Sequence, residues 1–190
     1  REDEFLGRFL RGAKGLPQRE REIAYKDLMN KRPELKTELK KEIEKVKTIA
    51  NILIKGPYPG ISSSHIDLFK AFVWRFWSIT SFKFGFIGAV LPRSVIAAKG
   101  SEVFRKELFK SSTSLEIVSL QNKGRWIFDL EPRYTILLTT ISKGETFKEG
   151  ILVKGPYSSM QEFTSGLSSK MPSFSSNEVL SWNEEATLPQ

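Results

Sequence analysis

His65 is the only histidine among the 190 residues, and the sequence contains no cysteine. A Ser-His-Asp triad, a multi-histidine metal site and a thiolate metal site are therefore not expected. Without cysteine there can be no disulfide bond, which favours a reducing, cytoplasmic environment. The short segments left for chemistry are the serine run Ser62, Ser63 and Ser64 and the turn-like sequence KGPYPG at 55–60.

The sequence KGPYPG follows a short apolar run, ANILI, as a Pro-aromatic catalytic loop would follow a strand. Enzymes that methylate amino groups of bases hold the base in an Asn-Pro-Pro-aromatic clamp, whose Asn side chain accepts a hydrogen from the amino group. Lys55 and Gly56 offer no such side chain. Only LRGAKGLP and charged helical sequence lie upstream, so the Gly-rich cofactor loop that should precede a clamp is missing. We therefore interpret KGPYPG as a turn.

The chain carries a net charge of +8 and has a pI near 9.6, which favours a polyanionic partner such as nucleic acid. Fifteen Lys and Arg stand against ten Asp and Glu through Lys55. Apolar residues recur there at helical spacing and predict a helix over 34–50, namely Leu35, Leu39, Ile43, Val46 and Ile49 or Ala50. This helix is either a basic arm lying on DNA or an amphipathic helix docked on a core. The alternation of both charge signs favours docking.

Residues 66–153 alternate between helical and strand-like patterns. The segment 66–79 is apolar on nearly all sides and predicts a buried helix, although Asp67, Lys70 and Arg75 exclude a membrane span. The segment 101–111 predicts an amphipathic helix with Ser101 as its N-cap. Strands are expected near 84–91, 115–120 and 134–142. The first of these is continuously apolar and closes at Pro92, which is typical of a strand covered on both faces in a parallel sheet.

This order predicts an α/β fold with the three strands in one sheet, helices packed on its faces in three layers, and a helical arm before it. A doubly wound sheet usually has five or more strands, so the pattern indicates half a domain. We assign 1–55 to a charged helical insertion or arm, 56–153 to the α/β half-domain, and 154–190 to a Ser-rich, irregular extension. Short helices are expected in that extension at 160–167 and 176–182.

Three collinear segments carry a resemblance to a known family: YPGISSSHIDLFKAFVWRFW, KFGFIGAVLPRSVIAAKGSEVFRKELF and LEIVSLQNKGRWIFDLEPRYTILLTT. Over roughly 57–142 they resemble the second half of the adenine-N6 DNA methyltransferase domain of type IIG restriction–modification enzymes and related phage-defence methylases. The opening EDEFLGRF with RPELK resembles the charged insertion that follows the clamp in those proteins. The tail FSSNEVLSWNEEATLP resembles the linker toward their target-recognition region.

The resemblance implies the C-terminal half of a Rossmann-like methyltransferase sheet in a bacterial or archaeal cytoplasmic protein. The parent protein would transfer a methyl group from S-adenosylmethionine to N6 of an adenine flipped out of DNA. The catalytic clamp is then expected upstream of Arg1 and the recognition region beyond Gln190. This chain alone would bind no cofactor and be inactive, and no metal or membrane partner is implied. A fused nuclease, the recognition sequence and the oligomeric state are left open.

Carried over by motif, Pro92 and Ser94 lie beside the base pocket, Asp67 starts the helix behind it, and Ser62, Ser63 and Ser64 lie on a loop facing substrate. Pro92 and Ser94 can equally be a strand end and a helix cap, and for Asp67 we favour an N-cap or first-turn acid. The candidates for contacts to the DNA backbone are Arg93, Arg125 and Arg133.

A second class of function remains open from the residues alone. A basic helical arm joined to a small α/β unit is also the pattern of a non-catalytic module that binds nucleic acid or protein. A complete small enzyme of another kind is disfavoured, because no paired acid–base constellation is present.

Overall fold

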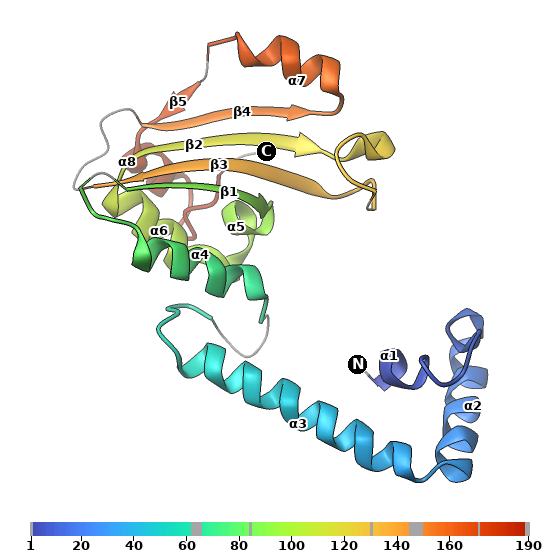
Figure 1. The fold of residues 1–190 in the computed structure, drawn as a ribbon. Coiled ribbons are helices and arrows are strands. Elements are labelled where there is room, and N and C mark those ends of the chain that lie inside the picture. The colour runs from blue at the N-terminus through green and yellow to red at the C-terminus, as the bar shows by residue number, and fades with distance from the viewer. Residues whose placement is uncertain are drawn as a thin grey trace. The chain divides into compact units, whose positions relative to one another are not determined.

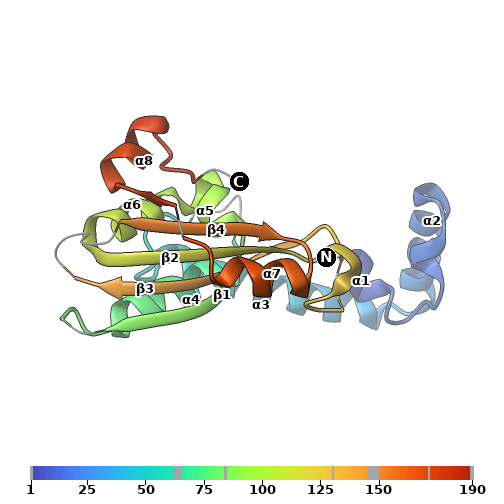
Figure 2. The same cartoon turned by 90° about the horizontal axis from the view of Figure 1, so that it is seen from above.

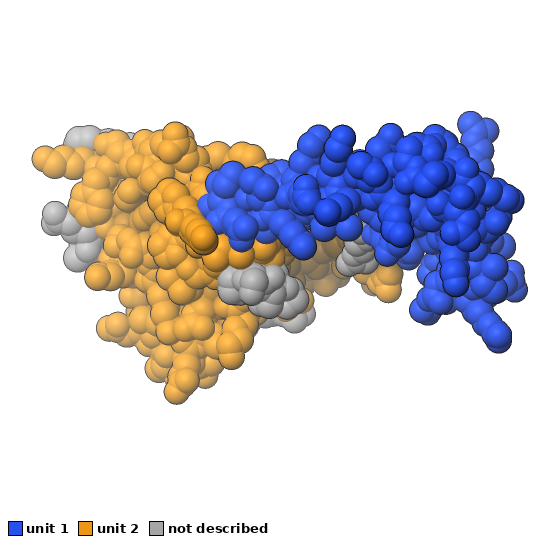
Figure 3. Space-filling model, turned by 90° about the horizontal axis from the view of Figure 1, so that it is seen from below, with its two compact units in different colours: residues 1–52 blue, residues 53–190 orange. Residues whose placement is uncertain are grey.

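A computed structural model of the chain describes residues 2–61, 66–83, 85–129, 131–144, 150–170 and 172–188. The chain divides into two compact units, Arg1–Ile52 and Leu53–Gln190, which are coloured separately in Figure 3. This division lies three residues before the boundary that we placed between 55 and 56.

The first unit contains α1 (Glu2–Leu6), the 3-10 turn η1 (Ala13–Gly15), α2 (Gln18–Lys31) and most of α3 (Glu34–Lys55). The predicted helix over 34–50 is confirmed and continues to Lys55. Its first turns dock Leu35 and Leu39 into a small apolar core with residues of α1 and α2. Farther along, Ile43, Val46 and Ile49 are exposed, so the docking interpretation holds only for the beginning of the helix.

The KGPYPG segment connects two helices. Because α3 runs through Lys55, no strand precedes the segment, and Tyr58 donates its backbone N–H to the Gly56 carbonyl at 2.8 Å. Gly60 has φ +80°, and a Cβ there would meet Val103 within 3 Å, so only glycine fits. The Trp74 indole donates to the Pro59 carbonyl at 2.9 Å. The interpretation of this segment as a turn is confirmed.

Within the described residues, the second unit has one five-stranded mixed sheet (Figure 1). Its strands are β1 (Phe86–Pro92), β2 (Ser112–Gln121), β3 (Thr135–Lys143), β4 (Ile151–Tyr157) and β5 (Ser173–Phe174), in the order β1-β3-β2-β4-β5. β3 is antiparallel to both β1 and β2, which are therefore parallel to each other. β4 is parallel to β2, and β5 is antiparallel to β4. The three predicted strands thus lie in one sheet, as expected.

The prediction for the first strand was wrong in one respect. β1 is an edge strand paired antiparallel with β3, and its side chains alternate between buried and exposed positions. Ile87 and Leu91 face the helices, whereas Phe86 and Val90 are 71% and 58% exposed. Within the described residues, this apolar strand is therefore covered on one face only.

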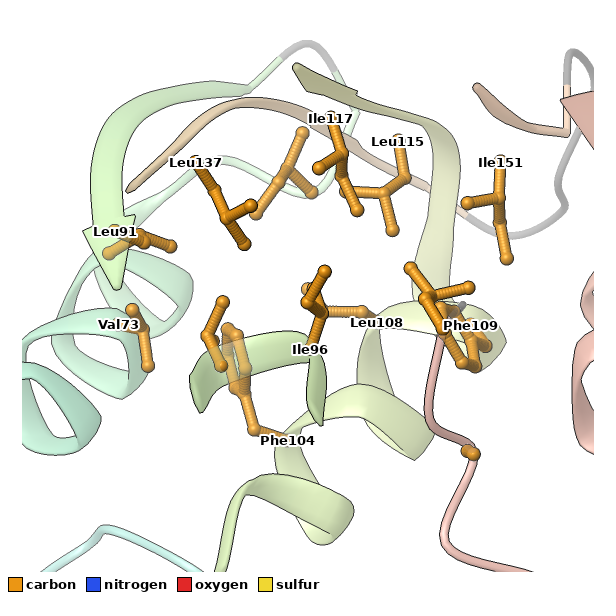
Figure 4. Close-up of a cluster of buried hydrophobic side chains, with 14 of the residues drawn as sticks. Val73, Leu91, Ile96, Phe104, Leu108, Phe109, Leu115, Ile117, Leu137 and Ile151 are labelled. Carbon is orange, nitrogen blue, oxygen red and sulfur yellow. The ribbon is translucent and has the colours of Figure 1, made fainter. Parts of the chain in front are cut away.

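One face of the sheet is covered by α4 (Leu68–Ile79), the short α5 (Ser94–Ala97) and α6 (Glu102–Ser111), while α7 (Met160–Leu167) lies on the other face (Figures 1 and 2). The predicted helices 66–79 and 101–111 thus share one face. Figure 4 shows the core between them and the sheet, where Leu115, Ile117 and Leu137 point toward Phe104 and Leu108. Ser101 occupies the N-cap position of α6, but its buried hydroxyl makes no hydrogen bond.

The prediction of a buried helix over 66–79 is right for one side of α4 and wrong for the other. Val73 and Trp77 enter the core, and Trp74 packs against Phe104 with ring centroids 5.1 Å apart. The opposite side of the helix carries apolar side chains that remain exposed, namely Leu68, Phe72, Phe76 and Ile79.

The C-terminal segment is part of the second unit. The boundary that we placed between 153 and 154 falls inside β4, and the predicted short helices are α7 and α8 (Ser176–Trp182). Each begins with a serine whose hydroxyl accepts an N–H of the first turn, Ser159 and Ser175. Val179, Ala186 and Leu188 are buried in the main core.

Candidate substrate site

The carboxyl ends of β1 and β2 meet at the same edge of the sheet because the two strands are parallel. Ligands of open α/β sheets bind at this edge. Pro92 ends β1, Arg93 and Ser94 open α5, and the loop 122–134 follows β2. The Arg93 backbone N–H donates to the Thr135 carbonyl at 3.3 Å, which joins the end of β1 to the end of the loop.

Asn122 joins residues 127, 128 and 134 of the loop after β2 through hydrogen bonds. Its side chain is buried; the amide nitrogen donates to the Phe128 carbonyl at 2.9 Å, and the amide oxygen accepts from the backbone N–H groups of Ile127 and Phe128 at 3.2 Å. Its own N–H donates to the Tyr134 carbonyl at 2.9 Å. The Trp126 indole adds a bond to the Gln121 carbonyl at 2.7 Å. These bonds tie the described residues 126–128 and 134 to the end of β2.

This loop and the end of β1 enclose an open cavity of about 340 Å³. Two aromatic side chains on the loop, Phe128 and Tyr134, line it while remaining 44% and 59% exposed. The other lining residues are Val90, Leu91, Pro92, Thr135 and Ile136. Exposed aromatic rings on this loop beside an apolar hollow suit a flat, partly apolar group such as a nucleobase.

Two of the candidate arginines lie on the same loop, whereas Arg93 lines a different cavity together with residues of α5, β2 and β4. Arg125 contacts Asp129 at 3.1 Å and Arg133 contacts Glu131 at 2.9 Å, and both arginine side chains are exposed. Exposed ion pairs of this kind contribute little free energy, so a phosphate can replace the carboxylate at small cost. Arg93 is half-buried at the start of α5. The structure therefore places the three arginines predicted to contact the DNA backbone at the end of the sheet where β1 and β2 terminate. It does not test their roles.

The remaining predicted residues are placed as follows. Pro92 lines the cavity, whereas Ser94 opens α5 and is not a lining residue. Asp67 stands at the N-cap position of α4, but its side chain makes no capping hydrogen bond. Ser62, Ser63, Ser64 and His65 lie outside the described residues.

Sequence reasoning missed the loop residues Phe128, Tyr134 and Asn122. A signal was present in the segment WIFDLEPRY, where aromatic residues flank an acidic turn with a proline instead of recurring at strand or helix spacing. Asn122 gave no signal of its own, because its role depends on contacts with residues five and six positions ahead.

Within the described residues, no helix is both long and apolar enough to cross a membrane. The same residues contain no group of three or more His, Cys, Asp or Glu that could hold a metal ion. Comparisons with protein-family models, with curated proteins and with solved structures found no match to this chain.

Proposed function

We propose that the second unit is the C-terminal half of an adenine-N6 DNA methyltransferase domain, from a restriction–modification or phage-defence protein that uses S-adenosylmethionine. The observation that carries the proposal is the coincidence of sequence motif and cavity. The strand ending in Pro92, which the resemblance places beside the base pocket, ends at an open hollow bordered by Phe128 and Tyr134.

The fold supports this proposal at a coarser level. β1 and β2 are parallel strands joined through α5 and α6, which is the β-α-β unit of Rossmann-like sheets. The cavity lies at the carboxyl end of that unit, where such sheets bind ligands.

The residues of the cavity would act by binding and positioning. Phe128 and Tyr134 would stack on an adenine that has left the duplex, and the apolar wall from Val90 to Pro92 would exclude water from it. Arg93, Arg125 and Arg133 would hold the neighbouring phosphates. S-adenosylmethionine would supply the methyl group when bound, and the clamp for the amino group is expected in polypeptide upstream of Arg1.

The test uses the product of the full reading frame that contains this sequence. The purified product is incubated with plasmid DNA and S-adenosylmethionine, and the nucleosides are analysed by mass spectrometry after digestion. We expect N6-methyladenine. Because stacking on one aromatic ring contributes about 1–3 kcal/mol, Phe128→Ala should lower kcat/KM by roughly 5- to 150-fold.

Leu180→Ala is the matched control, because Leu180 on α8 is 42% exposed, close to the 44% of Phe128, and does not line the cavity. It should leave kcat/KM unchanged. A product that binds DNA but forms no methylated adenine would refute the proposal in favour of the non-catalytic basic module.

A further inference from the structure

A second cavity lies at the carboxyl ends of β1, β2 and β4, which run parallel to one another. Because Ile96 and Ile117 line it, it lies on the side of the sheet that carries α5 (Figure 4). Its volume of about 40 Å³ has room for about three water molecules, which suits one small polar group and excludes a nucleobase. This cavity is here called the Ser119 cavity, and its polar lining includes Arg93, Ser119, Gln121 and Thr135.

A break in strand pairing shapes the Ser119 cavity. Between Val118 and Leu120 the pairing of β2 with β4 shifts register, so Gly155 and Pro156 of β4 face Ser119 alone. Gly155 has φ +88°, and a Cβ there would collide with the Ser119 carbonyl, so only glycine fits. Breaks of this kind are frequent beside functional sites, where they redirect side chains that would otherwise follow the regular sheet.

The polar side chains of the Ser119 cavity offer hydrogen-bond donors to a ligand. Ser119 and Thr135 contribute hydroxyl groups, and neither hydroxyl has a hydrogen-bond partner within the part of the chain that the structure describes. The amide oxygen of Gln121 accepts from the Ser158 hydroxyl at 3.1 Å, which leaves the amide nitrogen to donate. Arg93 has several N–H donors in its guanidinium group, so it can hold another partner and still donate to a ligand.

The charge around the Ser119 cavity favours an anion. Among the described residues that line it none is acidic, whereas Arg93 and Lys154 are basic. The Lys154 amine donates to the carbonyls of Gly166 and Leu167 at 3.0 and 2.7 Å, so it contributes charge but no direct donor. A guanidinium group beside hydroxyl and amide donors is a set of groups that binds phosphate oxygens.

We propose that the Ser119 cavity binds one phosphate group. The same chemistry could be met by a free phosphate or by a phosphate of the DNA backbone. The small volume of the cavity favours the free group, because a backbone phosphate brings a sugar on either side. This inference goes beyond the proposed function and does not depend on methyl transfer.

Titration of the 190-residue chain with inorganic phosphate, followed through the NMR shifts of backbone amides, tests the site. The amides of Ser119, Gln121 and Gly155 should shift and should saturate with one phosphate per chain. Shifts confined to amides elsewhere in the chain, or shifts at these amides that never saturate, would overturn the proposal.

Substitutions identify the donors. Ser119→Ala should weaken phosphate binding by roughly 10- to 150-fold, which is the range for a lost hydrogen bond to a charged group. Arg93→Gln should weaken it at least as much, because the charge is lost with the guanidinium fork. Arg133→Ala is the matched control: it removes the same charge at a side chain that is 87% exposed and does not line the cavity. If both Ser119→Ala and Arg93→Gln bound phosphate as tightly as the unaltered chain, the proposal would fail.

A short DNA duplex distinguishes the two sources of the phosphate. If the duplex leaves the amides of Ser119, Gln121 and Gly155 unchanged while inorganic phosphate moves them, the cavity takes a free phosphate group. If the duplex moves the same amides and Ser119→Ala abolishes those shifts, the group belongs to the DNA backbone. A full product that methylates no adenine would refute the proposed function and leave this site standing.

Discussion

Replacing Arg105 by alanine should detach the C-terminal segment from the core. The Arg105 side chain is 1% exposed and donates five hydrogen bonds to four backbone carbonyls, those of Val95, Ala98, Glu185 and Ala186, at 2.7–3.2 Å. It thereby joins α5 and the start of α6 to residues that follow α8. The next link is the Leu188 N–H, which donates to the Ile96 carbonyl at 3.2 Å.

The size of the loss follows from two opposing contributions. Each buried carbonyl that loses its donor lowers the free energy of unfolding by about 1–3 kcal/mol. Because four carbonyls lose a donor, this contribution alone predicts a large loss of stability. Removing a buried charge recovers several kcal/mol of its desolvation cost. Burial also lowers the pKa of Arg105, while Glu102 and Glu185 oppose that shift. The net expectation is a loss of about 3 kcal/mol in the free energy of unfolding, or about 10 °C in Tm.

Urea unfolding followed by tryptophan fluorescence measures this loss. Arg105→Lys keeps the positive charge but replaces the planar guanidinium group by a single amino group. The free energy of unfolding should therefore fall by about half as much as in Arg105→Ala. Arg133→Ala, at a side chain that is 87% exposed, should stay within about 0.5 kcal/mol of the unaltered chain. If Arg105→Ala lost less than about 1 kcal/mol with an unchanged m-value, the hydrogen bonds would not be what holds the C-terminal segment.

Four further outcomes are expected. Asn122→Ala should cost about 1–3 kcal/mol and speed the exchange of the Ile127 and Phe128 amides; unchanged exchange would mean that the loop is held elsewhere. Hydrogen bonds from the backbone and side chain of Ser175 lower the pKa of Glu178 below its usual 4.5, so this cap stabilises α8 fully above the unfolded-state pKa and loses that effect as pH falls through the folded-state pKa. A carboxyl titration by NMR with a midpoint at or above 4.5 would contradict it. In gel shifts, the 190-residue chain should bind two unrelated duplexes weakly and equally, with a salt slope of about 0.9 per phosphate contact; a preference for one duplex that survives added salt would place sequence readout in this chain. Calorimetric titration of the same chain with S-adenosylmethionine should detect no micromolar binding, because no Gly-rich cofactor turn is present in its sequence.

The elements of the second unit could be predicted because their patterns are local. Strand runs, the amphipathic α6 and the serine caps of α7 and α8 each depend on residues within a few positions of one another. β4 was missed, since ILVKGPY resembles a turn through its Gly155 and Pro156, and only pairing with β2 shows it to be a strand. Strand direction was missed for the same reason: apolar content indicates coverage but does not specify parallel or antiparallel neighbours.

The two errors about burial have one physical origin. The sequence of α4 is apolar nearly all round the helix, and that of β1 is apolar on both faces of the strand. Segments of this kind are normally covered on every side. In the structure, Phe72 and Phe86 are uncovered. Of the residues placed from motifs, Pro92 lines the cavity, whereas the roles of the three arginines stay predictions. Phe128 and Tyr134 were missed although WIFDLEPRY carried a signal, because their position beside the cavity depends on the hydrogen bonds of Asn122, which no sequence pattern announces.

The position of β3 also constrains how this unit can be made. β3 lies between β1 and β2, so these two strands do not pair with each other. While the ribosome is still synthesising residues 122–134, the strand that pairs with both has not yet been made. Until Lys143 has emerged, both strands lack the partner they share, so their apolar residues are exposed wherever α4 and α6 do not already cover them. Rare codons or pauses between β2 and β3 would prolong that exposure. Expression yield should therefore be more sensitive to the translation rate in this interval than in the segment after β4.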